Sequence, residues 1–449
     1  MASSSQTVSL RLVLVRHGLS SFNVDQRIQG RDDLSALTPQ GVEQARSTGD
    51  ALRELSLDAA YCSPLRRAHD TALTLLEAQG QGLSIALEPL LLEIDLAPWS
   101  GLTRDEVRAR FADDERIWRT APHQLELSDS SGQRFKPLMA LMEQADHFVQ
   151  RLRADHDAAI RGDVHQCVLV VAHNAILRAL VLRLLNLPAE QFRRLRIDNA
   201  SVSVFNLGES GVQIESLNST AHLGQALPER SAGPRLLLVR HGETDWNRQG
   251  RFQGQIDIPL NANGQRQAEA AGRALAAVHI DRAYTSSMAR PRQTAEAILR
   301  CHPGVPLTSS RGLIEIGHGL WEGQLEAEIA AGWPELLAAW KQAPQTVQMP
   351  EGENLQQVWD RSLLTWQRIA GALAANETAL VVAHDAVNKT ILCALLGLTP
   401  ADIWVIKQGN GGITAIDYPQ GPGGAPLVAA MNLTHHLGGV LDRTAAGAL

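Results

Sequence analysis

The sequence has few features of a secreted, membrane-bound or nucleic-acid-binding protein. Its 449 residues include only four cysteines. Cys62, Cys167, Cys301 and Cys393 share no metal-ligand spacing, which is typical of reduced thiols in a cytosolic protein. There is no basic tract, and the net charge is −7. This charge argues against nucleic acid or an anionic membrane as the main partner.

Long hydrophobic runs are also missing. No segment is long enough to cross a membrane, and the polar start, Met1 to Thr7, contains no apolar core of a signal peptide. We therefore expect a cytoplasmic location. The hydrophobic content of 44% is enough for two cores of ordinary size.

The sequence does contain a tandem duplication of one unit. The segment Leu12-Val13-Leu14-Val15-Arg16-His17-Gly18 returns as Leu236-Leu237-Leu238-Val239-Arg240-His241-Gly242. Each copy continues to an asparagine at the same distance, Asn23 and Asn247. An apolar run that ends in Arg-His-Gly is typical of a buried parallel strand that delivers its polar residues to a ligand site at its carboxyl end.

The duplication extends through the rest of the chain in the same order. Tyr61-Cys62-Ser63 matches Tyr284-Thr285-Ser286, and Val170-Val171-Ala172-His173 matches Val381-Val382-Ala383-His384. A Gly- and Pro-rich stretch separates the two copies and suits a linker. We therefore expect domains at residues 1–225 and 235–449, joined by a linker at residues 226–234.

Within each half, short apolar strands alternate with helical patterns, which favours an α/β fold with a largely parallel sheet and helices on both faces. Thr38 and Asn261 stand where a loop would cap the next helix. The segment between Glu93 and His173, or Glu315 and His384, differs in length between the copies. We expect this segment to be a helical cover that governs substrate choice.

The repeated polar residues suit a phosphoryl group. Arginine offers paired donors to phosphate oxygens and keeps its charge. A neutral histidine can attack phosphorus, and a glutamate can give a proton to the leaving oxygen. The candidate catalytic residues are His17, Glu93, His241 and Glu315. The candidate phosphate-binding residues are Arg16, Asn23, Arg67, His173, Arg240, Asn247, Arg290 and His384. Neither a metal nor another cofactor is expected.

Both halves resemble the histidine phosphatase superfamily, in the branch that contains cofactor-dependent phosphoglycerate mutases and many small-molecule phosphatases. The resemblance rests on the Arg-His-Gly segments and the three later motifs, and it covers nearly the whole chain. It implies tandem three-layer α/β/α domains and a phosphohistidine intermediate. The tandem order and the segments Leu92 to Leu96 and Val171 to Ala175 are similar to two-domain phosphatases described as metal-independent phosphoserine phosphatases or 2-carboxyarabinitol-1-phosphate phosphatases.

The two copies also differ near the expected sites. The first has Arg31 where the second has Gln255, and Arg134 in a segment that replaces the second copy's Pro350 to Asn354. These differences indicate a more electropositive first pocket that suits a substrate with a carboxylate. Asp385 follows the second histidine and could repel a phosphate if it faced inward. Further candidate substrate contacts are Gly30, Arg31, Asn174 and Gly254.

These features predict a metal-independent phosphatase for small phosphomonoesters, with phosphoserine as the first choice of substrate. The alternatives are a 2-carboxyarabinitol-1-phosphate or other sugar-acid phosphatase, a phosphoglycerate mutase and an α-ribazole phosphatase. One half could also be a non-catalytic phosphate-binding module. The expected partner is a small phosphorylated metabolite, with no nucleic acid and no membrane; a homodimer is allowed.

Overall fold

The computed structural model describes residues 10–129 and 131–445, so the polar start Met1 to Thr7 lies outside the described residues. The described residues form two compact units. The first unit consists of residues 10–212 and 218–225, and the second of residues 213–217 and 226–445. Residues 213–217 lie within strand β8 (Gly211–Ser219), and the sequence did not indicate their grouping with the second unit.

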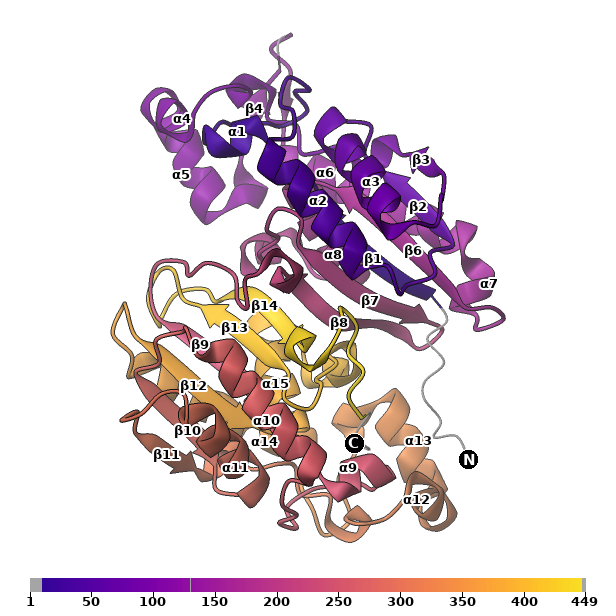
Figure 1. The fold of residues 1–449 in the computed structure, drawn as a ribbon, viewed down its shortest axis with the longest axis vertical. Helices are drawn as coiled ribbons and strands as arrows, with labels where there is room; N and C mark the ends of the chain where they lie inside the picture. The colour runs from indigo at the N-terminus through magenta and orange to yellow at the C-terminus, as the bar shows by residue number, and fades with distance from the viewer. Residues whose placement is uncertain (1–9, 130, 446–449) are drawn as a thin grey trace. The chain divides into compact units, whose positions relative to one another are not determined.

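The first unit is built on a mostly parallel sheet (Figure 1). Its strands lie in the order β3-β2-β6-β1-β7, and all neighbours are parallel except β1 and β7. The strands are β1 (Leu10–Arg16), β2 (Ala59–Cys62), β3 (Ile85–Leu87), β6 (Gln166–Ala172) and β7 (Val202–Gly208). A separate hairpin joins β4 (Leu127–Ser128) and β5 (Arg134–Phe135).

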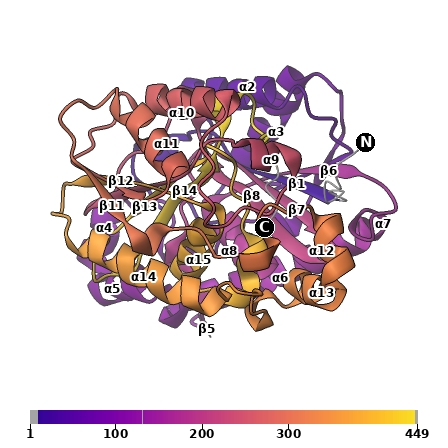
Figure 2. The ribbon, with the colours of Figure 1, turned by 90° about the horizontal axis from the view of Figure 1, so that it is seen from below.

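Helices cover both faces of this sheet. Figure 2 shows α2 and α3 on one side and α6 and α8 on the other. The helices of the first unit are α1 (Ser21–Val24), α2 (Pro39–Ala51), α3 (Arg66–Gln79), α4 (Arg104–Arg110), α5 (Ala112–Thr120), α6 (Pro137–Asp155), α7 (Asp157–Ile160) and α8 (Asn174–Leu184). The helices α4 to α7 lie between Glu93 and His173, where a helical cover was expected.

The second unit repeats this architecture. Its strands lie in the order β11-β10-β12-β9-β13-β14 and are β9 (Arg235–Arg240), β10 (Arg282–Ser286), β11 (Leu307–Ser310), β12 (Thr378–Ala383), β13 (Ile413–Asp417) and β14 (Leu427–Leu433). Its helices are α9 (Asp245–Gln249), α10 (Ala262–Leu275), α11 (Ala289–Leu299), α12 (Glu326–Gly332), α13 (Pro334–Gln342), α14 (Leu355–Gly371) and α15 (Asp385–Leu396). In Figure 2, α10 and α11 lie on one side of the strands and α14 and α15 on the other. The expected tandem three-layer α/β/α fold is confirmed.

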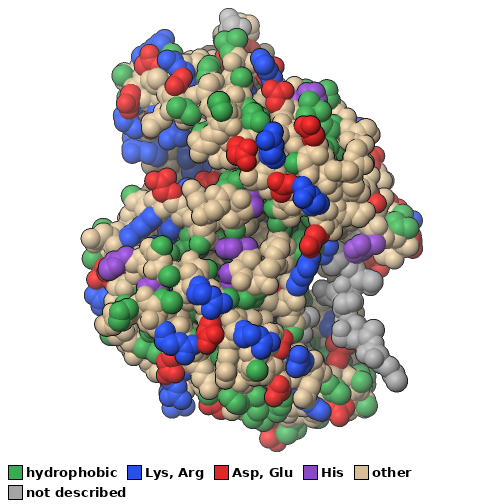
Figure 3. Space-filling view, viewed as in Figure 1, with side chains coloured by type: hydrophobic (Ala, Val, Ile, Leu, Met, Phe, Trp, Pro, Cys, Tyr) green, Lys and Arg blue, Asp and Glu red, His purple; other side chains and the backbone are tan. Residues whose placement is uncertain are grey.

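The apolar strands are buried because helices cover both faces of each sheet. Every residue of β9 and β12 is buried, and the side chains from Leu236 to Val239 are 0% exposed. On the surface, acidic and basic side chains are interspersed over the face that Figure 3 shows. Among the described residues, no helix is long and apolar enough to span a membrane.

The segment at residues 226–234 is tied to the second unit. The guanidinium of Arg230 donates to the carbonyls of Asn376 and Glu377, at 2.7 and 3.1 Å. The buried ion pair between Arg235 and Asp417 lies directly after the segment, and the amide of Ser231 donates to the same carboxylate. Much of this Gly- and Pro-rich stretch is therefore held against the second unit.

Both predicted helix caps are present. Each cap binds the amide of a glycine that lies close to the backbone just after the signature histidine, His17 or His241. The side chain of Thr38 accepts the amide of Gly41 at 3.0 Å, and that of Asn261 accepts the amide of Gly264 at 2.8 Å. A Cβ atom on Gly264 would lie 2.0 Å from the carbonyl oxygen of Glu243. Only glycine therefore lets α10 approach the strand end that carries His241.

Gly264→Ala is expected to lower the free energy of unfolding by about 2–3 kcal/mol, because the new methyl meets rigid backbone. The matched control is Gly371→Ala at the end of α14, where a Cβ atom would have no heavy atom within 4 Å. The control should be neutral or stabilise by at most about 1 kcal/mol. Urea unfolding of both full-length variants measures the difference, and equal midpoints would contradict the proposed close approach.

Candidate active site

Strand register brings the two histidines of the first unit together. Arg16 at the end of β1 pairs with Ala172 at the end of β6, so the next residues, His17 and His173, are neighbours. Their ring centroids are 5.2 Å apart, and the side chains are 2% and 0% exposed. Nδ1 of His17 lies 2.8 Å from the carbonyl oxygen of Gly18. A carbonyl can only accept, so Nδ1 carries the proton and Nε2 keeps its lone pair.

The second unit builds the same pair. Arg240 pairs with Ala383 across β9 and β12, and the ring centroids of His241 and His384 are again 5.2 Å apart. Nδ1 of His241 lies 2.7 Å from the carbonyl oxygen of Gly242. The Nε of Arg290 donates to Nε2 of His241 at 3.3 Å, which is consistent with a lone pair on that nitrogen.

Burial and neighbouring positive charge keep these imidazoles neutral. Burial lowers the pKa of His17 well below its usual value, and the charges of Arg16 and Arg67 lower it further. The pKa of His241 is lowered in the same way by burial, Arg290 and Arg240. Burial also lowers the pKa values of the second histidines, His173 and His384. Both Nε2 nitrogens of the signature histidines are therefore available as nucleophiles at neutral pH.

Backbone carbonyls hold the arginines of the first site. Arg16 donates to Ile197 at 2.8 Å, and Arg67 donates to Asp32 and Gly30 at 2.8 and 2.9 Å. Gly30, a candidate substrate contact, thus positions Arg67 through its carbonyl. Among the described residues, no carboxylate lies within ion-pair distance of Arg16 or Arg67, and the Nε atoms of both are buried without a partner. Burial is the largest cause that lowers the pKa of Arg16, to about 10.

In the second site, Arg290 is held like Arg67, while Arg240 has an added ion pair. Arg290 donates to the carbonyls of Ile256 and Gly254, at 3.3 and 2.7 Å. The carbonyl of Gly254 thus positions Arg290 as that of Gly30 positions Arg67. Arg240 donates to the carbonyl of Gln408, but its Nη1 also lies 3.5 Å from the carboxylate of Asp385. The sequence left open whether Asp385 faces inward. Its carboxylate does face the site, where it is paired with Arg240.

The two glutamates lie at the N-termini of the helices that follow the second histidines. The carboxylate of Glu93 accepts the amides of Ala175 and Ile176 at the start of α8, each at 3.1 Å. The carboxylate of Glu315 accepts the amide of Ala386 at the start of α15 at 3.4 Å. Burial raises the pKa of Glu315, with a further contribution from the charge of Asp385. Glu315 is thus suited to carry a proton for a leaving group.

Asn23 and Asn247 take part in equivalent networks beside the histidines. Each side-chain oxygen accepts from the residue that caps the short helix, Ser20 or Thr244. Each also accepts from a second asparagine, Asn199 at 3.1 Å and Asn410 at 3.4 Å. Asn199 and Asn410 also donate to the carbonyls of His17 and His241, at 3.0 and 3.1 Å. Asn199 and Asn410 thus link Asn23 and Asn247 to the backbone of His17 and His241.

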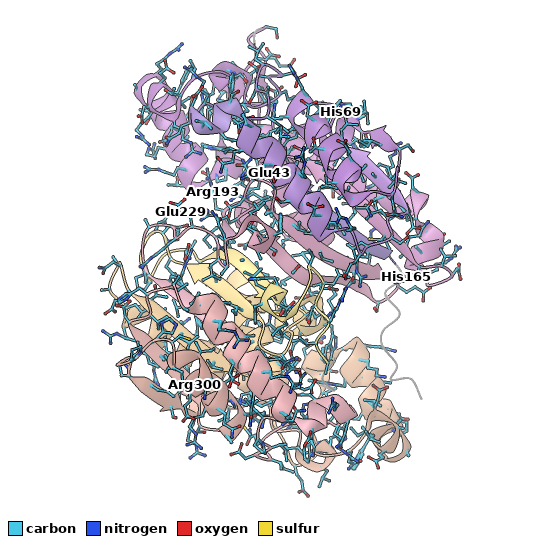
Figure 4. All side chains as sticks on the ribbon, viewed as in Figure 1. Glu43, His69, His165, Arg193, Glu229 and Arg300 are labelled. Carbon is cyan, nitrogen blue, oxygen red and sulfur yellow. The ribbon has the colours of Figure 1, made fainter. Side chains whose placement is uncertain are left out.

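Of the charge-bearing candidates, Arg31 contacts the backbone of Glu93, whereas Arg134 is paired with an acid. Arg31 is exposed and donates to the carbonyl of Glu93 at 3.1 Å and to Gln144 at 2.8 Å. Arg134 is paired with Glu126 at 2.6 Å in the β4–β5 hairpin, and its side chain is 73% exposed. Asn174 donates to the carbonyl of Ile197 at 3.2 Å, the same oxygen that holds Arg16. The histidines His69 and His165, labelled in Figure 4, lie elsewhere on the first unit.

A serine that was not among the candidate residues lies beside each second histidine. Ser63 lies 2.7 Å from Nε2 of His173, and Ser286 lies 2.9 Å from Nε2 of His384. Ser63 directly follows β2, and Ser286 is the last residue of β10. These strands lie beside β6 and β12, which lead to the second histidines. When the serine donates to Nε2, the Nδ1 of each second histidine carries the proton, and it is buried without a partner. The repetition of Tyr-x-Ser in both halves was the available signal.

Ser286→Ala is expected to lower kcat/KM of the second site roughly tenfold, because His384 loses the contact that fixes its tautomer and orientation. Ser286→Thr keeps a hydroxyl and should recover part of the loss. Ser309→Ala, an exposed position on β11, is the control. The measurement is steady-state phosphate release in a His17→Ala background. Unchanged kcat/KM in the alanine variant would exclude a positioning role.

Comparison with known proteins agrees with this geometry. The histidine phosphatase superfamily (branch 1) matches residues 12–220 and again 236–430, so the chain belongs to this family. It is a phosphatase, a hydrolase of phosphomonoesters. A 2-carboxy-D-arabinitol-1-phosphatase of Triticum aestivum is 30% identical over 457 residues, which cover 95% of this chain and 86% of the relative.

Two further relatives match about half of the chain. Phosphoserine phosphatase 1 of Hydrogenobacter thermophilus is 31% identical over 210 residues, covering 45% of this chain and 94% of the relative. A 2,3-bisphosphoglycerate-dependent phosphoglycerate mutase of Azorhizobium caulinodans is 34% identical over 201 residues, covering 44% of this chain and 92% of the relative. Each of these two relatives thus corresponds in length to about half of this chain.

Proposed function

We propose that each unit hydrolyses small phosphomonoesters through a phosphohistidine formed on His17 or His241. The observation that carries this proposal is a set of buried donors without partners around each nucleophile. In the first site these are the Nε atoms of Arg16 and Arg67 and Nδ1 of His173; in the second they are Nε of Arg240 and Nδ1 of His384. A phosphoryl group offers several acceptor oxygens and negative charge to such donors.

The first step forms the phosphohistidine. Nε2 of His17 attacks phosphorus while the bond from phosphorus to the ester oxygen breaks. The arginines and the second histidine stabilise the charge on the phosphoryl oxygens. The leaving alkoxide takes a proton from Glu93, or from Glu315 in the second site, and departs as the alcohol.

The second step releases phosphate. Water attacks the phosphohistidine, and the same carboxylate, now ionised, takes a proton from that water. The nitrogen–phosphorus bond breaks, inorganic phosphate leaves and the neutral imidazole returns. The carboxylate is again protonated, so the cycle balances without an added reactant.

For the first site we propose phosphoserine as substrate. The proposal is supported by the buried Nε atoms of Arg16 and Arg67, which have no partner, and by the likeness of half the chain to a phosphoserine phosphatase. A 2-carboxy sugar-acid phosphate is the second candidate, favoured by a relative that spans both units. Both compounds combine a phosphate with a carboxylate, so the same charges would recognise either.

The test is phosphate release by His241→Ala, which keeps only the first site. A panel should hold phosphoserine, 2-carboxyarabinitol 1-phosphate, α-ribazole phosphate and 3-phosphoglycerate, the last with and without a trace of 2,3-bisphosphoglycerate. Isomerisation without phosphate release would identify a mutase, and the highest kcat/KM for an uncharged ester would overturn the proposed acidic substrate. His17→Ala, measured in parallel, reports the second site.

We also propose that catalysis needs neither a metal nor another cofactor and that the protein is cytoplasmic. The supporting features are a proton donor and charge-stabilising groups supplied by side chains, and four free cysteines. A small phosphorylated metabolite is the proposed partner, in a chain that allows a homodimer. Chelators are expected to leave turnover unchanged, and inhibition reversed by added magnesium would contradict this.

A further inference from the structure

The two sites differ at the start of the helix that follows the second histidine. In the first site this helix, α8, carries Asn174 and Arg178; at the same distances from His384, α15 carries Asp385 and Lys389. Asp385 and Lys389 are only 5% and 7% exposed. The replacement therefore places an acid and its partner inside the second site.

Asp385 lies between two positive groups of the second site. One carboxylate oxygen is 2.9 Å from Nζ of Lys389, and the other is 3.5 Å from Nη1 of Arg240. The Nζ of Lys389 also lies 5.1 Å from the centre of the Trp404 ring. Asp385 thus offsets part of the charge that Arg240 would otherwise present to a substrate.

The second site also contains buried acceptors without donors. Oδ1 of Asp385 lies at the longer distance from Arg240 and has no hydrogen-bond partner. Oδ1 of Asn388, one turn further along α15, is buried and equally unpartnered. The amide of Asn388 lies 3.5 Å from the side chain of Gln408, whose carbonyl holds Arg240. Buried acceptors next to a phosphate-binding arginine are suited to a ligand group that donates hydrogen bonds.

The first site has two arginines, Arg178 and Arg193, in the corresponding region. Arg178 donates to the carbonyl of Leu195 at 2.8 Å and lies 4.5 Å from the centre of the Phe192 ring. Arg193, labelled in Figure 4, donates to the carbonyl of Trp118 on α5 and stands where the second unit has Trp404. Among the described residues, neither Arg178 nor Arg193 lies in an ion pair. Burial lowers the pKa of Arg178 to about 9, and the charge of Arg193 contributes to this lowering.

From these differences we infer that the two sites act on different phosphomonoesters. The second site accepts a leaving group with a hydrogen-bond donor, such as an ammonium, which reaches Asp385, and it discriminates against a carboxylate. The first site favours a leaving group with a carboxylate. This inference rests on the proposed function, because it requires both sites to hydrolyse phosphomonoesters, and it names the substrate class of the second.

Three esters of similar size separate the two selectivities: phosphoethanolamine with an ammonium, phosphoglycolate with a carboxylate, and ethyl phosphate with neither. Each kcat/KM is divided by that for ethyl phosphate. In full-length His17→Ala, this ratio should be higher for phosphoethanolamine than for phosphoglycolate. Adding Asp385→Asn should lower the phosphoethanolamine ratio roughly tenfold, because a charged hydrogen bond is lost. The matched control is Asn174→Asp in His241→Ala, which should lower the phosphoglycolate ratio instead.

The outcomes separate this inference from the proposed function. Hydrolysis by His17→Ala with ratios that Asp385→Asn leaves unchanged would overturn the inference alone. Loss of all hydrolysis in His17→Ala, while His241→Ala stays active, would overturn the inference together with the proposed hydrolysis by the second unit, and would leave the proposed function to the first unit alone. Loss of hydrolysis in both single-site variants, each with an unchanged thermal unfolding curve, would instead refute the proposed function.

Discussion

Replacing both His17 and His241 by alanine is expected to lower phosphomonoester hydrolysis about ten-thousand-fold or more, since each site loses its nucleophile. Their Nε2 atoms carry the lone pairs, because each Nδ1 donates to the carbonyl of the following glycine. The second histidines, His173 and His384, also have lowered pKa values, but their Nε2 atoms lie 2.7 and 2.9 Å from serine hydroxyls.

The measurement is phosphate release together with trapping of labelled phosphoprotein. Wild-type protein mixed briefly with labelled substrate should yield an acid-labile, base-stable phosphoprotein, and the double variant should yield none. The single variants assign the label to one unit each. Full turnover in the double variant, with an unchanged unfolding curve, would exclude a phosphohistidine at these positions. Loss of labelling together with unfolding would call for His→Asn at both positions, which keeps more of the side-chain volume.

Glu315→Gln in a His17→Ala background should lower kcat for alkyl phosphates about a hundred-fold or more, because the amide cannot protonate the leaving alkoxide. Glu93→Gln in a His241→Ala background is the matched variant for the first site. Both should retain more activity on p-nitrophenyl phosphate, whose leaving group needs no proton. Equal losses on both classes of ester would show that the glutamates act in another way.

The direction of the pKa shifts predicts the pH profile of the second site. Burial raises the pKa of Glu315, so this acid keeps its proton above the usual range of a glutamate and loses it as the pH rises through that raised value. The lowered pKa of His241 keeps the nucleophile neutral as the pH falls below 6.5, the usual value for histidine. Activity should therefore persist into mildly acidic solution and decline on the alkaline side. Glu315→Gln should abolish the alkaline decline; an unchanged profile would assign that decline to another group.

Much of the fold and of the site could be predicted from the sequence because their signals are local and occur twice. An apolar run before Arg-His-Gly indicates a strand buried on both faces, and a matching run ends at His173 or His384. Parallel strands bring their carboxyl ends to one edge of the sheet, so these residues were expected to meet. The register pairs of Arg16 with Ala172 and of Arg240 with Ala383 have this arrangement.

The partners of these residues depend on contacts that no local pattern contains. Ser63 reaches His173 only because β2 lies beside β6, and Asn199 reaches His17 across most of the first half of the chain. Arg134 suited a basic pocket by its sequence position, yet the hairpin pairs it with Glu126. Such contacts depend on the register and packing of strands and loops distant in sequence.

By itself, the sequence determined the tandem architecture and brought each of the two signature histidines together with the arginines around it, because spaced motifs repeated in order fix which residue types meet. Only the tertiary structure decided the charge balance of each site. Asp385 could have repelled phosphate, but the folding of α15 against β9 places its carboxylate between Lys389 and Arg240. The effect of a buried charge depends on the groups within a few ångströms, and those are set by packing rather than by order along the chain.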